Sequence, residues 1–460
     1  MKSIRLILIS FLFVISLSCL YSNIQAQEMP LLQVSANKRF FQTSNGQPFF
    51  WLGDTGWLLF SKTNRQQAIQ YLDVRKAQGF TVIQAMVLHS LQAKNAYDVK
   101  ALDNNDVSRP LTTPGDTTNY WNHISFIIEE AAKRNIYMAL VPVWGSNVKS
   151  GKVSVEQATQ YARFLAERFR QYNNILWVNG GDVKGTDGMA VWQAIGNTLR
   201  QYDTRHLVTF HPRGRYSSSE WFHNQSWLDF NMFQSGHRTY AQDTTRSEKN
   251  HFGEDNWKYV QHDYTLQPRK PTLDGEPSYE NIPHGLHDSL QPRWNDADLR
   301  RYAYWSVFAG GAGFTYGENA VMQFHSKGDA DANYGVTGNW TSTIYAKGAI
   351  QLHHLKELLL YYPYFEREPA QEIIAGNQQP QYNFIVATKG KRYALVYTYT
   401  GKNFSIDTGK LGFTVKRSQW FSPATGKKQA ADFRRTTQQL SFDPPGNPAN
   451  GNDWVLILEG

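Results

Sequence analysis

The stretch NILWVNGGD (residues 174–182) begins as an apolar run and ends abruptly in polar residues and glycines. Ile175 to Val178 is typical of a buried strand, and Asn179, two glycines and Asp182 follow it directly. Asn, Gly and Asp are common turn formers, so a plain turn is one interpretation. The other is an acidic side chain that a strand presents at the mouth of a barrel, and the rest of the chain has to decide between them.

Short apolar strands alternate with helical stretches on both sides of this segment. Seven more strands are predicted at 48–55, 80–88, 136–145, 207–212, 227–236, 271–277 and 311–317. Helices are predicted near 64–78, 118–134, 154–172, 189–202, 296–309 and 345–360, and a longer polar insertion follows 227–236. Near-continuous apolar strands between helices indicate a parallel sheet covered by helices. Eight such units predict an α/β fold, a (β/α)8 TIM barrel with insertions.

The two ends of the chain differ from this pattern. Residues 31–46 are predicted to form a hairpin that turns at Asn45-Gly46 and could cap the barrel floor. After about residue 370 only short alternating strands remain, separated by Gly, Pro, Asn and Lys. We therefore predict a barrel domain over 27–370 and a small antiparallel β-sandwich over 371–460 that packs closely against it.

Residues 1–26 are predicted to be a signal peptide. Lys2 and Arg5 precede an apolar run, and a small residue, Ala26, stands at the expected cleavage site. The run is short for a membrane span, and no later stretch is apolar enough to be one. The mature chain is therefore expected to be exported, to the periplasm or the medium. Cys19 is an alternative lipid anchor for a surface lipoprotein, although Ser16 stands where such sites usually carry an aliphatic residue.

Composition excludes several classes of function. The chain is 41% hydrophobic and 19% charged, which is not the composition of a disordered protein. The net charge of +8 falls to about +6 without Lys2 and Arg5, and the basic residues form no patch or nucleic-acid module. We predict no nucleic-acid partner. Cys19 is the only cysteine, so the mature chain would have neither a disulfide nor a thiol nucleophile.

A barrel of this type carries its chemistry at the carboxyl ends of its strands. The polar and aromatic residues predicted at those ends are Asp54, Gln84, His89, Trp144, Asn179, Asp182, His211, Arg213, Gln234, His237, Asp274, Glu276, Tyr316 and Glu318. Acids, amides, histidines and aromatic rings at one rim are what a sugar site needs, because polar groups bind hydroxyls and rings stack on apolar sugar faces.

Two of these acids, Asp182 and Glu276, follow strands that lie across the barrel mouth from each other. Glycoside hydrolysis requires such a pair, one acid and one base or nucleophile, and we predict both as catalytic. Both interpretations of residues 174–182 then hold, since the glycines let the backbone turn and present Asp182 at the barrel mouth. The predicted substrate-binding residues are Asp54, Gln84, His89, Trp144, Asn179, His211, Gln234, His237 and Tyr316.

Some of these residues have equally plain structural explanations. Asp54 could cap the segment that follows it, a role as well supported as orienting substrate. Asp274 could serve its own turn beside Gly275. The sequence shows neither HExxH nor GxSxG, which argues against zinc-peptidase and serine-hydrolase chemistry.

The remaining histidines do not suggest a metal site. His284 and His287 are spaced like ligands but lack the further ligands that a closed site needs. His353 and His354 are expected on the surface or floor of the last helix. We predict no metal and no other cofactor.

Several long motifs, in order, resemble the apiosidase-like glycoside hydrolases, glycoside hydrolase family 140 and its relatives. They are FFWLGDTGWLLF, YLDVRKAQGFTVIQAMVL, WVNGGD, LDGEPSYE and GAGFTYGENAVMQF. The tail, WFSPATGKK to DWVLILE, resembles the domain labelled collagen-binding that follows the barrel in those proteins. Phe314 departs from the pattern, because relatives often carry His there, and SPATG replaces the commoner DPRTG.

The resemblance implies a (β/α)8 barrel and a retaining mechanism, with Asp182 matching the acid/base and Glu276 the nucleophile. It also implies a pectin substrate, the apiose linkage of rhamnogalacturonan II. Two alternatives remain, a retaining barrel glycosidase for another plant polysaccharide and a non-catalytic glycan- or matrix-binding protein. A binder would have no need of the paired acids, which argues against the last.

Overall fold

A computed structural model of the chain describes residues 29–244, 251–435 and 438–460. The predicted export signal, residues 1–26 with Lys2, Arg5 and Cys19, lies outside this part of the chain. Among the described residues, no helix combines the length and the apolar character that a membrane crossing requires.

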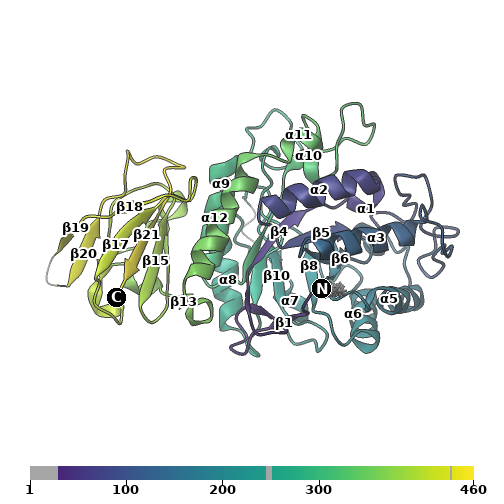
Figure 1. The fold of residues 1–460 in the computed structure, drawn as a ribbon, viewed down its shortest axis with the longest axis horizontal. Coiled ribbons are helices and arrows are strands. Elements are labelled where there is room, and N and C mark those ends of the chain that lie inside the picture. Colours follow the sequence, from purple (N-terminus) through teal and green to yellow (C-terminus); the bar gives the residue numbers. More distant parts are fainter. Residues whose placement is uncertain (1–28, 245–250, 436–437) are drawn as a thin grey trace, which may run out of the picture.

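Eight parallel strands form the centre of the larger domain, which confirms the predicted barrel (Figure 1). They are β4 (Trp51–Thr55), β5 (Val82–Met86), β6 (Tyr137–Val141), β7 (Ile175–Val183), β8 (Val208–Pro212), β10 (Asn231–Gln234), β11 (Thr272–Asp274) and β12 (Gly313–Tyr316). Their hydrogen-bonded order is β8-β7-β6-β5-β4-β12-β11-β10. Most are buried along their whole length because side chains fill the barrel on one face and helices cover the other.

The barrel closes between β8 and β10 by contacts at their starts rather than by a regular ladder. The backbone N–H of Asp229 donates to the carbonyl of Val208 at 2.8 Å, and Thr209 Oγ1 donates to the carbonyl of Phe230 at 2.7 Å. The two-residue strand β9 (Tyr216–Ser217) pairs antiparallel with β10 on this side.

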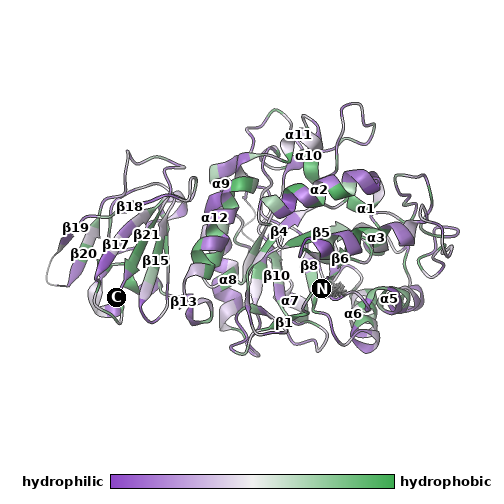
Figure 2. Cartoon of the chain, in the orientation of Figure 1, coloured by the Kyte–Doolittle hydropathy of each residue, from purple (hydrophilic) through white to green (hydrophobic). Residues whose placement is uncertain are grey.

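Helices surround the barrel, and in Figure 2 the central strands are mostly coloured as hydrophobic while the helices also carry hydrophilic stretches. The long helices are α2 (Arg65–Ala77), α3 (Tyr120–Lys133), α5 (Val155–Phe169), α6 (Met189–Tyr202), α8 (Asn256–Thr265), α9 (Asp296–Phe308) and α12 (Lys347–Tyr361). The short ones are α1 (Leu59–Lys62), α4 (Gly145–Lys149), α7 (Ser219–Phe222), α10 (Asn319–Met322) and α11 (Trp340–Thr343). Six of the long helices match predictions, and α8 replaces part of the expected polar insertion.

The predicted N-terminal hairpin is a three-stranded sheet, β1 (Leu32–Val34), β2 (Phe41–Thr43) and β3 (Pro48–Phe49). The Asn45-Gly46 turn connects β2 to β3, and Gly46 has a φ of 77°. Phe41 is fully buried, with its ring 5.0 Å from that of Phe230 at the start of β10. Burying such a ring stabilises the fold by about 1.5–3 kcal/mol. Because the ring packs at the start of a barrel strand, this sheet closes the barrel floor.

Two antiparallel sheets form the smaller domain, as predicted. One contains β13 (Glu368–Pro369), β14 (Ile385–Lys389), β15 (Tyr393–Thr398), β17 (Arg417–Phe421), β18 (Lys428–Ala430) and β21 (Trp454–Glu459). The other contains β16 (Phe404–Asp407), β19 (Phe433–Arg435) and β20 (Gln439–Phe442). Four single turns of 3-10 helix complete this region, η1 (Tyr364–Glu366), η2 (Gln371–Ile373), η3 (Gln381–Asn383) and η4 (Thr408–Lys410).

The two domains share a packed interface, on the side of the barrel that carries α8, α9 and α12 (Figure 1). Trp257 of α8 stacks on Phe384 with ring centroids 3.9 Å apart. Tyr304 of α9 stacks on Tyr397 at 4.8 Å. Beside these rings, the guanidinium of α9 Arg300 pairs with the Asp453 carboxylate at 2.8 Å, and both side chains are buried.

Candidate active site

A pocket of about 490 Å³ opens at the carboxyl ends of the barrel strands. Six of the residues predicted at those ends line it, namely His89, Trp144, Asp182, Gln234, His237 and Glu276. Residues that follow the strand ends complete the wall, among them Trp57, Ser61, Lys62, Tyr279, Asp331 and Tyr334.

Asp182 reaches the pocket through a β-bulge rather than a turn that ends the strand. Gly180 pairs with His211 and Val183 with Pro212, so two residues of β7, Gly181 and Asp182, oppose none on β8. Three successive residues have left-handed φ values, 88° at Gly180, 117° at Gly181 and 51° at Asp182. The strand therefore continues past the predicted turn, and the bulge turns Asp182 out of the ladder into the pocket.

Both glycines of this bulge are required by space as well as by φ. A Cβ on Gly181 would lie 2.5 Å from Cε3 of Trp144, and one on Gly180 would lie 2.6 Å from the carbonyl oxygen of His211. The indole of Trp144 therefore packs directly on the bulge that carries Asp182.

Glu276 lies two residues beyond β11 and is clamped by two histidines. His237 Nε2 donates to Oε1 at 3.0 Å, and His211 Nε2 lies 3.1 Å from Oε2, although poorly aligned for a hydrogen bond. The backbone N–H of Asp182 points at His211 Nδ1 across 3.4 Å. An acceptor at Nδ1 places the His211 proton on Nε2, facing Glu276, so one imidazole links the two acidic residues.

The surroundings shift the pKa values of the two acids in opposite directions. Desolvation at the barrel mouth, followed by the charge of Glu276, raises the pKa of Asp182 to about 6, although its side chain is exposed to the pocket. Burial also acts to raise the pKa of Glu276, but His211 and His237 outweigh it and hold that pKa below the usual range. One acid is thus poised to hold a proton while its neighbour is ionised, as acid and nucleophile roles require.

Two aromatic side chains that were not predicted, Trp57 and Tyr279, join Trp144 in the wall beside this pair. The rings of Trp57 and Trp144 lie 5.2 Å apart, and Trp57 Nε1 donates to the Tyr279 hydroxyl at 3.1 Å. Burial, then the charge of Glu276, raises the pKa of Tyr279 well above its ordinary value. Trp57 is two residues beyond Thr55, the end of β4, so a search extended past the strand ends would have included it.

Two predicted substrate residues support the pocket from behind. Gln84 is fully buried, and its Nε2 donates to the carbonyl of Gly275 at 2.9 Å, which holds the backbone next to Glu276. His211 is fully buried and acts on Glu276 as described above. Arg213, two residues beyond His211, contributes a positive charge that lowers the pKa of Asp182 against the larger desolvation effect.

Asp54, Asn179 and Tyr316 are placed away from the pocket and do not line it. Asp54 is fully buried and pairs with Arg75 Nε at 2.6 Å, so it fixes α2 to the barrel. Asn179 Nδ2 donates to the carbonyl of Trp192, and Tyr316 donates its hydroxyl to a buried acid behind the wall. Successive side chains of a strand point to opposite faces of the sheet. A position at the end of a strand therefore predicts the rim of the barrel but not whether the side chain faces the pocket.

Two other strand-end acids are also satisfied internally. Asp274 is fully buried and accepts hydrogen bonds from Ser235 Oγ and Asn256 Nδ2, at 2.7 and 3.0 Å. Glu318 accepts from the backbone N–H groups that open α10 and is the cap of that helix.

The histidines outside the pocket make contacts of their own. The ring of His284 packs on Trp294 at 4.3 Å, and that of His287 lies 6.0 Å from Tyr334. His353 pairs with Glu357 on α12, and its neighbour His354 packs against Gly426 of the smaller domain. In the part of the chain that the structure describes, no three His, Cys, Asp or Glu side chains are grouped as metal ligands would be.

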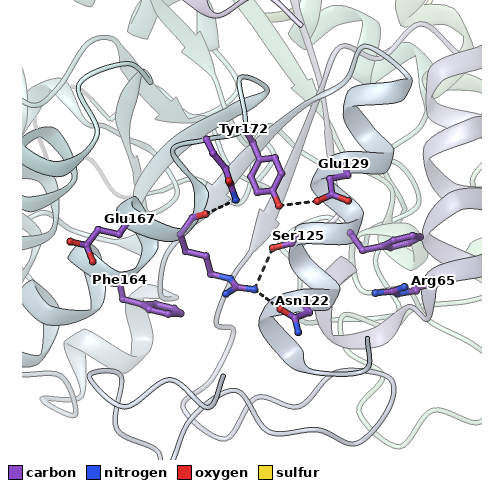
Figure 3. Close-up of a pocket in the computed structure, with 10 residues that line it drawn as sticks. Arg65, Asn122, Ser125, Glu129, Phe164, Glu167 and Tyr172 are labelled. Carbon is purple, nitrogen blue, oxygen red and sulfur yellow. Dashed lines mark hydrogen bonds between the residues drawn. The ribbon is translucent and has the colours of Figure 1, made fainter. Parts of the chain in front are cut away.

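A larger hollow, of about 760 Å³, lies on the outside of the barrel between α3 and α5 (Figure 3). Several of its polar side chains bind each other. The Tyr172 hydroxyl donates to Glu129 at 2.9 Å, and Arg168 Nη2 donates to Asn122 at 2.8 Å. Because these groups are already paired and lie on the outer helices, away from the strand ends where a barrel carries its chemistry, the pocket at the strand ends is the candidate active site.

Comparisons with known proteins agree with this geometry. A family model described as "Apiosidase-like, catalytic domain" matches residues 35–366, and one described as "Putative collagen-binding domain of a collagenase" matches residues 369–459. Comparison with curated proteins gave no match.

Two solved structures are similar over nearly the whole chain. One, described as a glycoside hydrolase, is 41% identical with a TM-score of 0.88, covering 94% of this chain and 97% of its own. The other, a glycoside hydrolase family 5 protein from Bacteroides vulgatus, is also 41% identical with a TM-score of 0.88, covering 93% of each chain. The chain is therefore a glycoside hydrolase and belongs to the apiosidase-like family.

Proposed function

We propose that the enzyme is a retaining glycoside hydrolase in which Asp182 is the acid/base and Glu276 the nucleophile. The observation that carries this assignment is the contrast between two acids in one pocket: Glu276 is buried between His211 and His237, whereas Asp182 is exposed to the pocket. The directions of their pKa shifts, upward for Asp182 and downward for Glu276, agree with it. Retaining hydrolysis needs a protonated group at the leaving oxygen and an ionised one at the anomeric carbon.

The proposed reaction has two steps. The Glu276 carboxylate attacks the anomeric carbon as the glycosidic C–O bond breaks, and the proton of Asp182 passes to the departing oxygen. This leaves a covalent glycosyl ester on Glu276 and an ionised Asp182. Asp182 then removes a proton from water, the water oxygen attacks the anomeric carbon, and Glu276 is released as the carboxylate.

The surrounding residues support these steps. His237 and His211 stabilise the carboxylate form of Glu276 before it attacks. They stabilise the same negative charge again when the ester breaks and the carboxylate re-forms. The exposed Asp182 can reach both the leaving group and the incoming water. Trp144, which is partly exposed, offers an apolar face to a sugar ring, and the buried Trp57 packs beside it.

The proposed substrate is pectin, and within it the apiose-linked side chains of rhamnogalacturonan II. The match of residues 35–366 to the apiosidase-like catalytic domain supports this choice. The proposed activity is of the type found in glycoside hydrolase family 140. We further propose that residues 1–26 export the enzyme to the periplasm or the medium, where plant cell-wall polymers are accessible.

Incubation of the purified enzyme with rhamnogalacturonan II, other pectins and hemicelluloses tests the substrate. We expect product release from rhamnogalacturonan II, and Glu276→Gln should lower kcat by at least about a thousandfold because an amide cannot attack the anomeric carbon. Glu129→Gln, in the outer hollow, is the matched control and should keep full activity. Release from another polysaccharide alone would move the proposal to that substrate, and tight binding without release would favour a glycan-binding protein.

The stereochemistry of the product tests the mechanism separately. We predict carboxyl groups about 5–6 Å apart and a first-formed sugar with retained anomeric configuration, observed by proton NMR during turnover. An inverted first product would assign water, rather than Glu276, as the attacking group.

A further inference from the structure

One wall of the pocket comes from the segment 331–334, which lies between α10 and α11 and far in sequence from Asp182. Asp331, Asn333 and Tyr334 all line the pocket. At its start the segment contacts α1, since Lys62 Nζ, which also lines the pocket, donates to Asp331 Oδ1 at 2.6 Å. Gln323 then holds Asn333 at both backbone groups, at 3.0 and 3.3 Å.

The backbone of Tyr334 is held in a conformation that a tyrosine rarely adopts. Its φ is 55°, in the left-handed region where side chains with a Cβ are disfavoured. Asn319 Nδ2 donates to its carbonyl at 3.0 Å, and Arg293 Nη2 donates to the carbonyl of Gly335 at 2.6 Å. Two side chains from other elements therefore maintain this strain. Strain of this kind in a pocket is often retained for function.

The side chain of Tyr334 is also in an unusual place for a large ring. It is 37% exposed and faces the pocket rather than the barrel core. Partial burial, then the charges of Glu276 and Asp182, raises the pKa of its phenol. Tyr334, Asp182 and Glu276 all line the same pocket, so the phenol faces the space in which a bound sugar would lie.

We propose that Tyr334 is a substrate-contacting residue, held in a strained conformation so that its ring and hydroxyl meet the sugar bound between Asp182 and Glu276. This proposal rests on the proposed function for the location of the sugar. It explains why the chain keeps a tyrosine at φ 55° where Asn or Gly would be easier to accommodate.

The test replaces Tyr334 with Asn, which accepts left-handed φ values and removes the ring. In Tyr334→Asn, kcat/KM on rhamnogalacturonan II oligosaccharides should fall at least about tenfold, while Tm stays level or rises because strain is relieved. Tyr334→Phe should lose less kcat/KM than Tyr334→Asn, because it keeps the ring and removes only the hydroxyl contact. Lys38→Asn is the matched control, since Lys38 is exposed at the barrel floor with a φ of 61° and should change only Tm.

Two results would overturn the proposal. The first is a wild-type kcat/KM in Tyr334→Asn. The second is a Tm in that variant more than about 3 °C below wild type, which would make Tyr334 a structural residue. If wild-type enzyme leaves rhamnogalacturonan II intact, that result counts against the proposed substrate alone. The kcat/KM comparison of Tyr334→Asn is then made on the polysaccharide of the panel that the wild-type enzyme does hydrolyse.

Discussion

Asp182 and Glu276 share one pocket but meet different neighbours. Glu276 faces two imidazoles, whereas Asp182 faces the pocket and the charge of Glu276. The difference is local, since it depends on two histidines at the ends of β8 and β10. A conservative change at His211, which is fully buried and does not line the pocket, would therefore alter the ionisation of Glu276 without touching the substrate.

The alkaline side of the pH profile should belong to Asp182. Its pKa is raised to about 6, and only its protonated form can donate to the leaving group, so kcat/KM should fall as pH rises through about 6. In Asp182→Asn this fall should disappear, and a nitrophenyl glycoside, which needs little acid assistance, should lose less rate than the natural substrate. The measurement is kcat/KM between pH 4 and 9 for both enzymes. An unchanged alkaline limb in Asp182→Asn would assign it to another group.

Most of the acids and histidines of the pocket could be predicted because parallel strands all end at the same rim. The residues that were missed, Trp57, Tyr279 and Tyr334, lie in loops whose course depends on tertiary contacts such as Lys62 with Asp331. Asp54 was predicted at the same rim, but its carboxylate forms a fully buried ion pair with Arg75. Strand periodicity carries no information about that partner.

The β-bulge in β7 is the element that places Asp182. An Ala at position 181 would meet both an unfavourable φ of 117° and the Trp144 ring at 2.5 Å. We expect Gly181→Ala to lower stability by about 2–4 kcal/mol and kcat by at least about a hundredfold, because a small displacement of a catalytic group is enough. Urea unfolding and kcat measure the two effects.

Gly151→Ala is the matched control for this prediction. Gly151 has a φ of 73°, and nothing lies within 4 Å of a Cβ built on it, so it isolates the backbone strain. Its kcat should remain that of wild type. Equal behaviour of the two variants would remove the role assigned to the contact between Trp144 and the bulge.

The fold could be predicted at the level of strands and long helices because their apolar periods are strong. Helix α8 was missed because its sequence, NWKYVQHDYT, is mostly polar. It is stabilised from outside, by Tyr259 stacked on Phe233 at 5.0 Å and Trp257 stacked on Phe384. The bulge in β7 could not be told from a turn, because Asn, Gly and Asp occur in turns and in bulges alike. Only the strand pairing with β8 distinguishes a bulge from a turn here.

At the scale of the whole molecule, a buried ion pair joins the two domains. Arg300 Nε and Nη2 both donate to Asp453, at 2.9 and 2.8 Å, and neither side chain is more than 3% exposed. Asp453→Asn should destabilise the protein by about 3 kcal/mol because Arg300 would lose part of its compensation in a dry site. Asp98→Asn, in the exposed pair with Lys94, should change stability by no more than about 0.5 kcal/mol. Thermal unfolding of both variants makes the comparison.

Removing the smaller domain should damage the barrel. Residues 27–368 alone would expose Tyr304 and Trp257, whose rings now stack on Tyr397 and Phe384. We expect this fragment to aggregate or to melt well below the full mature chain. Solubility, Tm and activity of the two proteins provide the comparison. A soluble, equally stable and fully active fragment would show that the β-sandwich is an appendage with a ligand of its own.

The charge of the pocket also has a consequence for inhibitors. Below pH 6 the pair carries one negative charge, on Glu276, and above it Asp182 adds a second. An iminosugar, whose ring nitrogen is protonated, resembles the oxocarbenium ion and gains attraction from each charge. Such a mimic should therefore bind more tightly as the pH rises past the range in which the enzyme turns over best. In the proposed mechanism, the same asymmetry that favours hydrolysis in mild acid would make the resting enzyme most vulnerable to cationic sugar mimics near neutrality.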